Sequence, residues 1–162
     1  MNRELIEQYA KGGEKLALAV RGLTREDMLA MPTSNDPNVG RWSIHQVVIH
    51  LLDSDLIAMD RIKRMIAMPN PQIIGYDENL FIQHLMPDEQ SAEDAIQILD
   101  LSFKNFARVL RKLPDEAFER HGTHNERGRT TAAEYITFMV KHMDHHLKFI
   151  HAKRAAMGKE MW

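Results

Sequence analysis

Apolar residues recur at intervals of three and four along four long segments, and this spacing constrains the fold more than any other feature of the chain. Residues three and four apart share one face of an α-helix, so each segment predicts an amphipathic helix that buries one side. The expected helices run from Asn2 to Val20, Ser43 to Ile66, Ser91 to Lys112, and Thr131 to a stop at Gly158. Alternating β-branched runs bounded by tight turns are absent, so no strand is predicted.

Capping residues mark where the helices begin. Ser43 with Gln46, and Thr131 with Glu134, have the spacing of capping boxes, in which a side chain and a backbone N–H satisfy each other reciprocally. Thr24 is placed to cap a short helix over residues 25–30. These signals favour helices with well-defined ends.

Glycine and proline divide the remaining chain. Gly12 and Gly13 interrupt the first helix, where we expect a bend or a close approach of another helix. Residues 32–42 and 114–130 are expected to be loops, and residues 67–90 form a long connection with a short helix near residues 77–84. Long connections in compact domains are usually functional or disordered, and the aromatic and apolar content of this one favours a packed lid over a flexible linker.

Four helices, two of them joined by a long crossing connection, predict an all-α four-helix bundle. The length of 162 residues suits one domain spanning 1–162. The content of 44% hydrophobic and 27% charged residues is typical of a soluble globular protein. We therefore expect a single continuous core and no domain boundary.

Charge and cysteine content exclude several classes of function. The net charge is -2 and the basic residues are scattered, which argues against nucleic-acid binding. No apolar run approaches a membrane span, and the first residues have no signal-peptide pattern, so we expect a cytoplasmic protein and no membrane partner. The chain contains no cysteine, which excludes disulfides and thiolate metal sites.

Histidines supply the candidate chemistry. His142 and His146 are four residues apart and point the same way from the last helix, whereas His145 lies about 100° further round, nearer the wet face. His50 shares an inward face of the second helix, and Asp53, one turn on, is placed to hold a ligand ring by its second nitrogen. Three imidazoles from two helices would leave open coordination positions, as catalytic metals use.

Other interpretations of these histidines exist. A single histidine on an apolar face is more often a hydrogen-bonded core residue than a ligand, and nine histidines in the chain raise the frequency of chance pairs. The last helix lacks the His-Glu-x-x-His sequence, so a zinc protease is not indicated. The eleven methionines are interpreted as core-filling residues.

Two segments together resemble a known family. Residues 41–55, Arg-Trp-Ser-Ile-His-Gln-Val-Val-Ile-His-Leu-Leu-Asp-Ser-Asp, resemble the Trp-Ser/Thr…His-Leu-x-Asp segment of the DinB-like superfamily. Residues 142–146, His-Met-Asp-His-His, resemble its closing His-x-x-His-His motif. The loops at residues 76–78 and 124–128 resemble its branch of metal-dependent hydrolases and bacillithiol transferases.

This resemblance implies an up-down-down-up bundle, often a homodimer, with one divalent metal, zinc or nickel. Its three ligands would be His50, His142 and His146, the same residues that helical spacing selects. One departure is His45, where many members have glutamate. We expect His45 to be exposed or to cap the helix.

The resemblance also implies a small-molecule substrate. The metal would activate a low-molecular-weight thiol for transfer to an electrophile, or a water for hydrolysis. Tyr76, Asp77 and Glu78 are candidates for the mouth of the site, although an ordinary turn explains them as well. His124 and Glu126 are interpreted as a polar loop rather than a proton relay. Two alternatives stay open: a non-catalytic, stress-related metal-binding protein, and a helical interaction module with incidental histidines.

Overall fold

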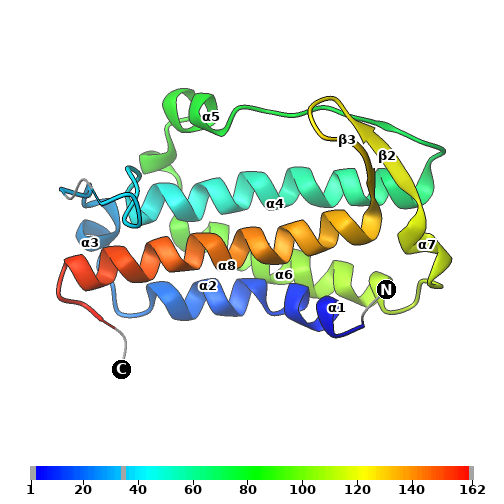
Figure 1. The fold of residues 1–162 in the computed structure, drawn as a ribbon. Coiled ribbons are helices and arrows are strands. Elements are labelled where there is room, and N and C mark those ends of the chain that lie inside the picture. The colour runs from blue at the N-terminus through cyan, green and yellow to red at the C-terminus, as the bar shows by residue number, and fades with distance from the viewer. Residues whose placement is uncertain (1–2, 34–35, 161–162) are drawn as a thin grey trace.

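Four rows of helix form the body of the molecule (Figure 1), as the apolar spacing predicts. The computed structural model describes residues 3–33 and 36–160, so Asn2, the expected start of the first helix, lies outside the described residues. The rows are α1 (Arg3–Ala10) continued by α2 (Gly12–Val20), α4 (Ile44–Ala67), α6 (Ala92–Leu110) and α8 (Ala132–Ala156). Each predicted long helix is therefore present.

The directions of the rows follow the up-down-down-up order. In Figure 1 the row of α1 and α2 runs the same way as α8, while α4 and α6 both run in the opposite direction. α4 packs against α6 and α8, and the first row packs against the same two helices. Because α4 and α6 are parallel, the chain must return along the whole bundle between them, and residues 68–91 make that return.

The helices begin where the capping residues predict. The boxes of Ser43 with Gln46 and of Thr131 with Glu134 are both formed. Thr24 caps the short helix α3 (Arg25–Leu29) in the same manner. In the long connection, Asp77 accepts hydrogen bonds from two backbone N–H groups at the start of α5 (Glu78–His84). Local side-chain chemistry thus sets the ends of these helices.

Two glycines explain the break in the first row. α1 ends at Ala10 and α2 begins at Gly12, and the chain there lies directly against α6. A Cβ at Gly13 would lie 2.4 Å from the Cα of Asp100, and one at Gly12 would lie 2.8 Å from the ring of Phe103. Both the break and the close packing agree with the sequence prediction.

The core lies between the four rows and is almost entirely apolar. Its largest fully buried side chains are Phe103, Phe118, Ile6, Leu16, Ile44, Ile49, Leu51, Ile62, Met65, Ile73, Leu99 and Leu110. None of the described helices has the combination of length and hydrophobicity that crossing a bilayer requires. The hydrophobic faces of the helices pack against one another in this core.

The expectation of no strands was wrong in two segments, which pair with each other in one small sheet. Residues 114–130, predicted as loop, contain α7 (Glu116–Glu119), β2 (His121–His124) and part of β3 (Gly128–Thr131). β2 pairs antiparallel with β3 and parallel with β1 (Gln72–Ile73) from the long connection, which also holds the 3-10 turn η1 (Pro87–Glu89). Strands of two to four residues are too short to show an alternating pattern, and their pairing depends on tertiary contacts.

Candidate metal centre

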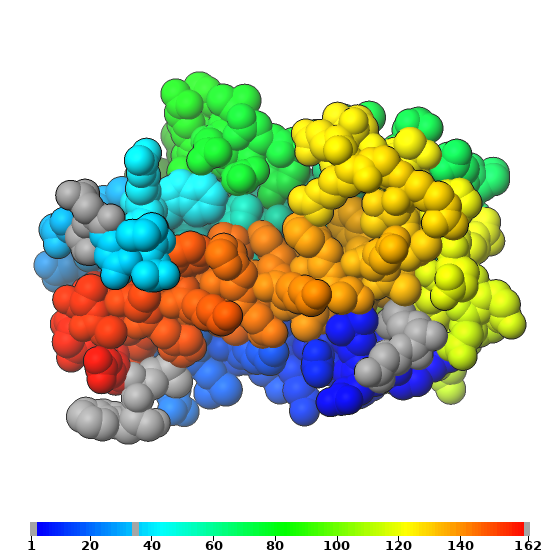
Figure 2. All heavy atoms as spheres, in the orientation of Figure 1, coloured from blue at the N-terminus to red at the C-terminus, as the bar shows by residue number. Residues whose placement is uncertain are grey.

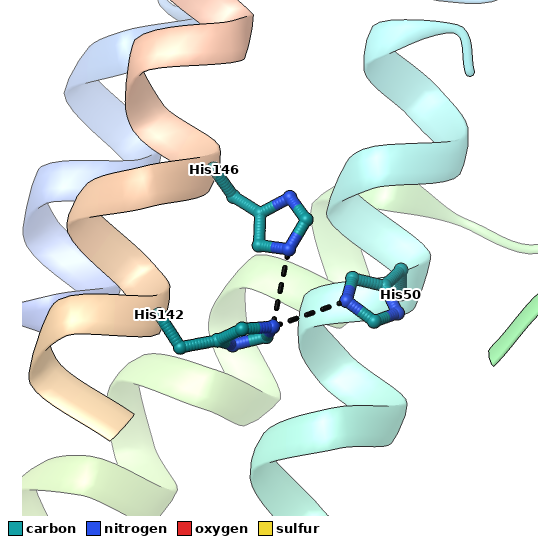
Figure 3. A group of neighbouring side chains, drawn as sticks. All are labelled: His50, His142 and His146. Carbon is teal, nitrogen blue, oxygen red and sulfur yellow. Dashed lines mark hydrogen bonds between the residues drawn. The ribbon is translucent and has the colours of Figure 1, made fainter. Parts of the chain in front are cut away.

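Two helices position the three predicted metal ligands. His50 lies near the start of α4 on the side that faces α8, and His142 and His146 lie one turn apart on α8. Figure 3 shows the three rings turned toward one another across the space between the two helices. His50 and His146 are buried and His142 is half-buried. The structure thus brings together the three histidines selected from the sequence.

The ring nitrogens are spaced as ligands of one ion would be. The Nε2 atom of His142 lies 3.3 Å from Nε2 of His50 and 3.1 Å from Nε2 of His146. All three candidate ligand atoms lie within 4.8 Å of one another. Imidazole nitrogens that each bind a tetrahedral ion at about 2.0–2.1 Å are roughly 3.4 Å apart, so these spacings fit the group.

Electrostatics keep these imidazoles neutral. Burial, with the neighbouring rings as a second cause, lowers the pKa of His50 and of His142 to about 4 and that of His146 to about 2. Each Nε2 has one in-plane position, which holds either a proton or a lone pair, so His142 cannot bond well to both neighbours at once. A cation between three lone pairs resolves this conflict.

The second nitrogens of the rings face the protein. The Nδ1 atoms of His142 and His146 are buried and have no hydrogen-bond partner among the described residues. Asp53 is half-buried on α4, and burial raises the pKa of its carboxyl. In the described chain it makes no hydrogen bond to His50. The role of Asp53 in orienting a ligand histidine therefore stays a prediction.

A cavity of about 360 Å³ lies directly over the three rings. Its remaining walls come from the chain before α4, α4 itself, the long connection, the β2–β3 hairpin and α8: Trp42, Ser54, Ala58, Arg61, Gly75, Tyr76, Glu78, His124, Glu126, Arg127, Tyr135, Phe138, Met139 and His145. In Figure 2 the α5 segment and the β2–β3 hairpin rise as separate masses above α4 and α8, with a notch between them. The three nitrogens therefore lie at the floor of an accessible space.

Of the predicted mouth residues, Tyr76 and Glu78 line this cavity, as do His124 and Glu126. The Tyr76 hydroxyl donates a hydrogen bond of 3.0 Å to Oγ of Ser54, and burial raises the pKa of Tyr76. Asp77 differs, since its carboxylate caps α5 instead. The connection from α4 is thus the wall of a site, as a packed lid would be.

The hairpin and the long connection hold each other in place over the histidines. The backbone N–H of Gly75 donates to Oδ1 of Asn125 at 2.8 Å, and Asn125 in turn donates its backbone N–H to Ile73. A Cβ at Gly75 would lie 2.6 Å from a carboxylate oxygen of Glu126. Glycine at this position lets the acidic side chain lie against the backbone.

The predicted exposure of two further histidines, His145 and His45, was right for the first and wrong for the second. His145 is exposed, as predicted, and borders the cavity, where its ring contacts Phe149 with centroids 4.8 Å apart. The prediction that His45 is exposed or capping was wrong. His45 is 2% exposed, and its Nε2 lies 3.0 Å from the carbonyl oxygen of Pro87. It fastens η1 to the start of α4, which the helix pattern alone does not indicate.

Sequence reasoning missed the basic and aromatic walls of the cavity. Arg61 follows His50 by eleven residues, which is three helical turns along the same face. Its guanidinium donates to the Tyr135 hydroxyl at 2.7 Å and to the carbonyl of Ile74. Phe138, one turn before His142, lies beneath the Arg127 guanidinium at 4.2 Å. Extending the histidine stripe along α4 and α8 would have found Arg61 and Phe138.

Comparison with known proteins gives consistent matches. A sequence model of the DinB superfamily matches residues 4–150. A "Putative metal-dependent hydrolase" of Bacillus mycoides is 27% identical over 163 residues, spanning 98% of this chain and 90% of the relative. One of the same name from Bacillus cereus strain B4264 is 32% identical over 121 residues, spanning 74% and 69%.

A solved structure agrees as well. YfiT from Bacillus subtilis, described as a probable metal-dependent hydrolase with an unusual four-helix bundle topology, superimposes with a TM-score of 0.86. It is 25% identical, and the match covers 96% of this chain and 86% of YfiT. The similarity therefore extends over the whole bundle, including the helices that carry the three histidines.

Proposed function

The chain belongs to the DinB superfamily, and on that premise we propose that it is a metal-dependent enzyme acting on a small molecule. His50, His142 and His146 hold one divalent ion, zinc or nickel, and the cavity above them binds the substrates. The observation that carries this proposal is the convergence of three neutral Nε2 atoms at the floor of a cavity with polar walls. A stored or structural ion would instead be enclosed on all sides.

The ion and the residues around it have different chemical roles in this proposal. When bound, the ion supplies Lewis acidity that lowers the pKa of a thiol or a water. The carboxylates of Glu78 and Glu126 border the cavity, where they can accept the proton that such a nucleophile loses. Arg61 and Arg127 place positive charge on the same walls, which favours substrates that carry acidic groups.

The nucleophile we favour is the sulfur of a low-molecular-weight thiol, transferred to an electrophilic cosubstrate. Because the chain contains no cysteine, any sulfur chemistry has to use a thiol from outside. A mixed set of acidic and basic walls also suits the ammonium and carboxylate groups that small cellular thiols carry. Hydrolysis by water is the second candidate, and the names of the relatives favour it.

A non-catalytic, stress-related metal-binding protein is the alternative. It requires a metal whose free position is dry and apolar, and the polar cavity argues against that. A homodimer and a cytoplasmic location belong to the proposal as well. Their support is the family resemblance for the dimer and the absence of cysteine for the location.

Metal content, measured by mass spectrometry on protein purified without a histidine tag, tests the metal site first. We expect about one divalent ion per chain, lost in His50→Ala and His142→Ala. His151→Ala is the matched control, since His151 lies on the same helix but is exposed and outside the cavity. Equal metal loss in the control, or no metal uptake by any form, overturns the proposal and leaves the interaction module.

Activity assays on the metal-loaded protein then separate the two reactions. Thiol transfer is measured as loss of free cysteine or bacillithiol with 1-chloro-2,4-dinitrobenzene, and hydrolysis as release of nitrophenol from 4-nitrophenyl acetate without thiol. Metal-dependent thiol loss supports transfer, and metal-dependent ester cleavage supports hydrolysis. If a panel of such substrates shows neither while one ion stays bound per chain, the non-catalytic alternative replaces the proposal.

A further inference from the structure

A second cavity, of about 230 Å³, lies on the other side of the metal site. Trp42 and His146 line both this cavity and the one over the three rings, so the two spaces share these two walls. The Trp42 ring also contacts His50, with centroids 5.0 Å apart. A molecule in the second cavity would therefore lie beside the metal ligands without occupying the first cavity.

The chemistry of the second cavity differs from that of the first. Its walls include Val47 and Phe149, which with Trp42 offer apolar and aromatic surface. Its charged walls are Arg41 and Lys153, and none of the described acidic residues borders it. The first cavity has both signs of charge. The second cavity is thus suited to a molecule with an apolar body and a negative group.

Lys153 is the unusual member of this set. It follows His146 by seven residues, which places both side chains on the same face of α8. Lys153 is 4% exposed, its Nζ donates to the carbonyl of Val39, and Nζ lies 5.5 Å from the centre of the Phe149 ring. Among the described residues it forms no ion pair, and burial lowers its pKa to about 8.

A buried ammonium without a carboxylate partner is costly, so lysine at such a position requires an explanation. The carbonyl of Val39 uses one of the three N–H donors of the ammonium. Gly40, in the left-handed region at φ +69°, leaves open the space where a Cβ would lie 3.5 Å from Nζ. An anion entering the cavity from this side would find free donors and positive charge.

We propose that this second cavity is the subsite for the electrophilic cosubstrate, and that Lys153 binds a carboxylate on that molecule while Trp42 and Phe149 pack against its apolar body. This inference rests on the proposed function, because only a two-substrate reaction needs a second space beside the metal. Lys153 then acts as a specificity-determining residue. The cosubstrate class is an aromatic or branched apolar carboxylic acid, held with its reactive carbon toward His146.

Binding of phenylacetate to the metal-loaded protein, measured by isothermal titration calorimetry, tests the subsite. Phenylacetamide is the uncharged comparison with the same shape. We expect phenylacetate to bind more tightly, and Lys153→Met to weaken phenylacetate at least about tenfold while leaving phenylacetamide nearly unchanged, since a charged hydrogen bond is lost. Lys148→Met is the matched control, because Lys148 is an exposed lysine on the same helix.

Two more variants keep the test decisive. Arg41→Gln alters only the exposed rim of the cavity and should weaken phenylacetate by a smaller factor. His142→Ala removes a metal ligand outside the second cavity and should leave binding at Lys153 intact. Phenylacetate binding that is lost in His142→Ala but kept in Lys153→Met would place the carboxylate on the metal and overturn the inference. Lack of metal in the unmodified protein would instead overturn the proposed function.

Discussion

α4 carries buried titratable groups on two sides, and the two sides differ in kind. His50 is 5% exposed and faces α8 beneath the large cavity. Asp55, five residues later, is 2% exposed and lies with Tyr9 inside the bundle. The space beside Asp55 measures about 10 Å³, room for a single water at most, against about 360 Å³ above His50.

Burial favours the neutral form of both His50 and Asp55, so burial alone does not distinguish the two sides of α4. It lowers the pKa of His50 and raises the pKa of Asp55 well above its ordinary value, which favours the neutral form in each case. What His50 has and Asp55 lacks is a set of partners with the same chemistry and a path to solvent. A shifted pKa therefore indicates a candidate site here only where several groups of the same chemistry converge and solvent can reach them.

The largest difference between the two sides should be in metal binding. We expect His146→Ala to weaken zinc binding by more than about 100-fold, because even groups that only support a ligand contribute roughly 10–100-fold. Asp55→Asn should leave zinc affinity unchanged. Competition against a chromophoric chelator measures both. Comparable weakening by the two substitutions would mean that Asp55 belongs to the metal centre.

The pH dependence of stability in the metal-free protein should have opposite signs on the two sides. The folded pKa values of the three ligand histidines lie below the ordinary 6.5, so they contribute stability that is present above pH 6.5 and lost as pH falls toward 4. The folded pKa of Asp55 is raised above 3.8, so its contribution is present below that pH and lost as pH rises.

Urea unfolding in EDTA at intervals between pH 7 and pH 4.5 measures this dependence. We expect the unfolding free energy to decrease toward acid, less steeply in His146→Ala and more steeply in Asp55→Asn. The same slope in all three proteins would show that neither side titrates as its burial implies. The comparison needs the metal-free protein, because bound metal excludes protons from the histidines.

The sequence was sufficient to predict the features of α4 and α8 that follow from helical periodicity and capping. Spacing placed His50, His142 and His146 on facing stripes, and capping residues located the starts of α4 and α8. The cavity walls depend on contacts between distant segments, as between Gly75 and Asn125, which no local pattern encodes. Spacing from Leu51 and Ile62 places Asp55 on their buried face, but it was not singled out, because one acidic residue without partners of the same chemistry does not indicate a site.

The close packing of α2 against α6 in the bundle core should respond strongly to a single added methyl group. Gly13→Ala places a Cβ against the α6 backbone at Asp100, and overpacking of this kind costs about 1–3 kcal/mol. Gly12→Ala is the comparison, because its Cβ would meet the side chain of Phe103 rather than a helix backbone, and a side chain can shift further than packed backbone. Urea unfolding should show Gly13→Ala as clearly less stable than Gly12→Ala, with metal stoichiometry unchanged in both. Equal stability would mean that α2 and α6 can separate at no cost.

The smallest expected effect is a gain of stability at Asp55. Its Oδ2 atom is buried without a hydrogen-bond partner among the described residues, and such a group costs roughly 1–3 kcal/mol. Asp55→Leu removes that cost, and the small space beside it accepts part of the added volume, so we expect about 1 kcal/mol of extra stability at pH 7.

Asp60→Leu, on the exposed side of the same helix, should change the unfolding free energy by no more than about 0.5 kcal/mol. If Asp55→Leu destabilises the protein while zinc affinity is kept, a water or a neighbouring group already satisfies the carboxyl, and the core side holds a polar network. If stability rises and zinc affinity is kept, α4 separates a replaceable polar residue from a functional one by five positions. Burial at Asp55 is then a cost to the fold, whereas burial at His50 keeps a nitrogen lone pair ready for a cation.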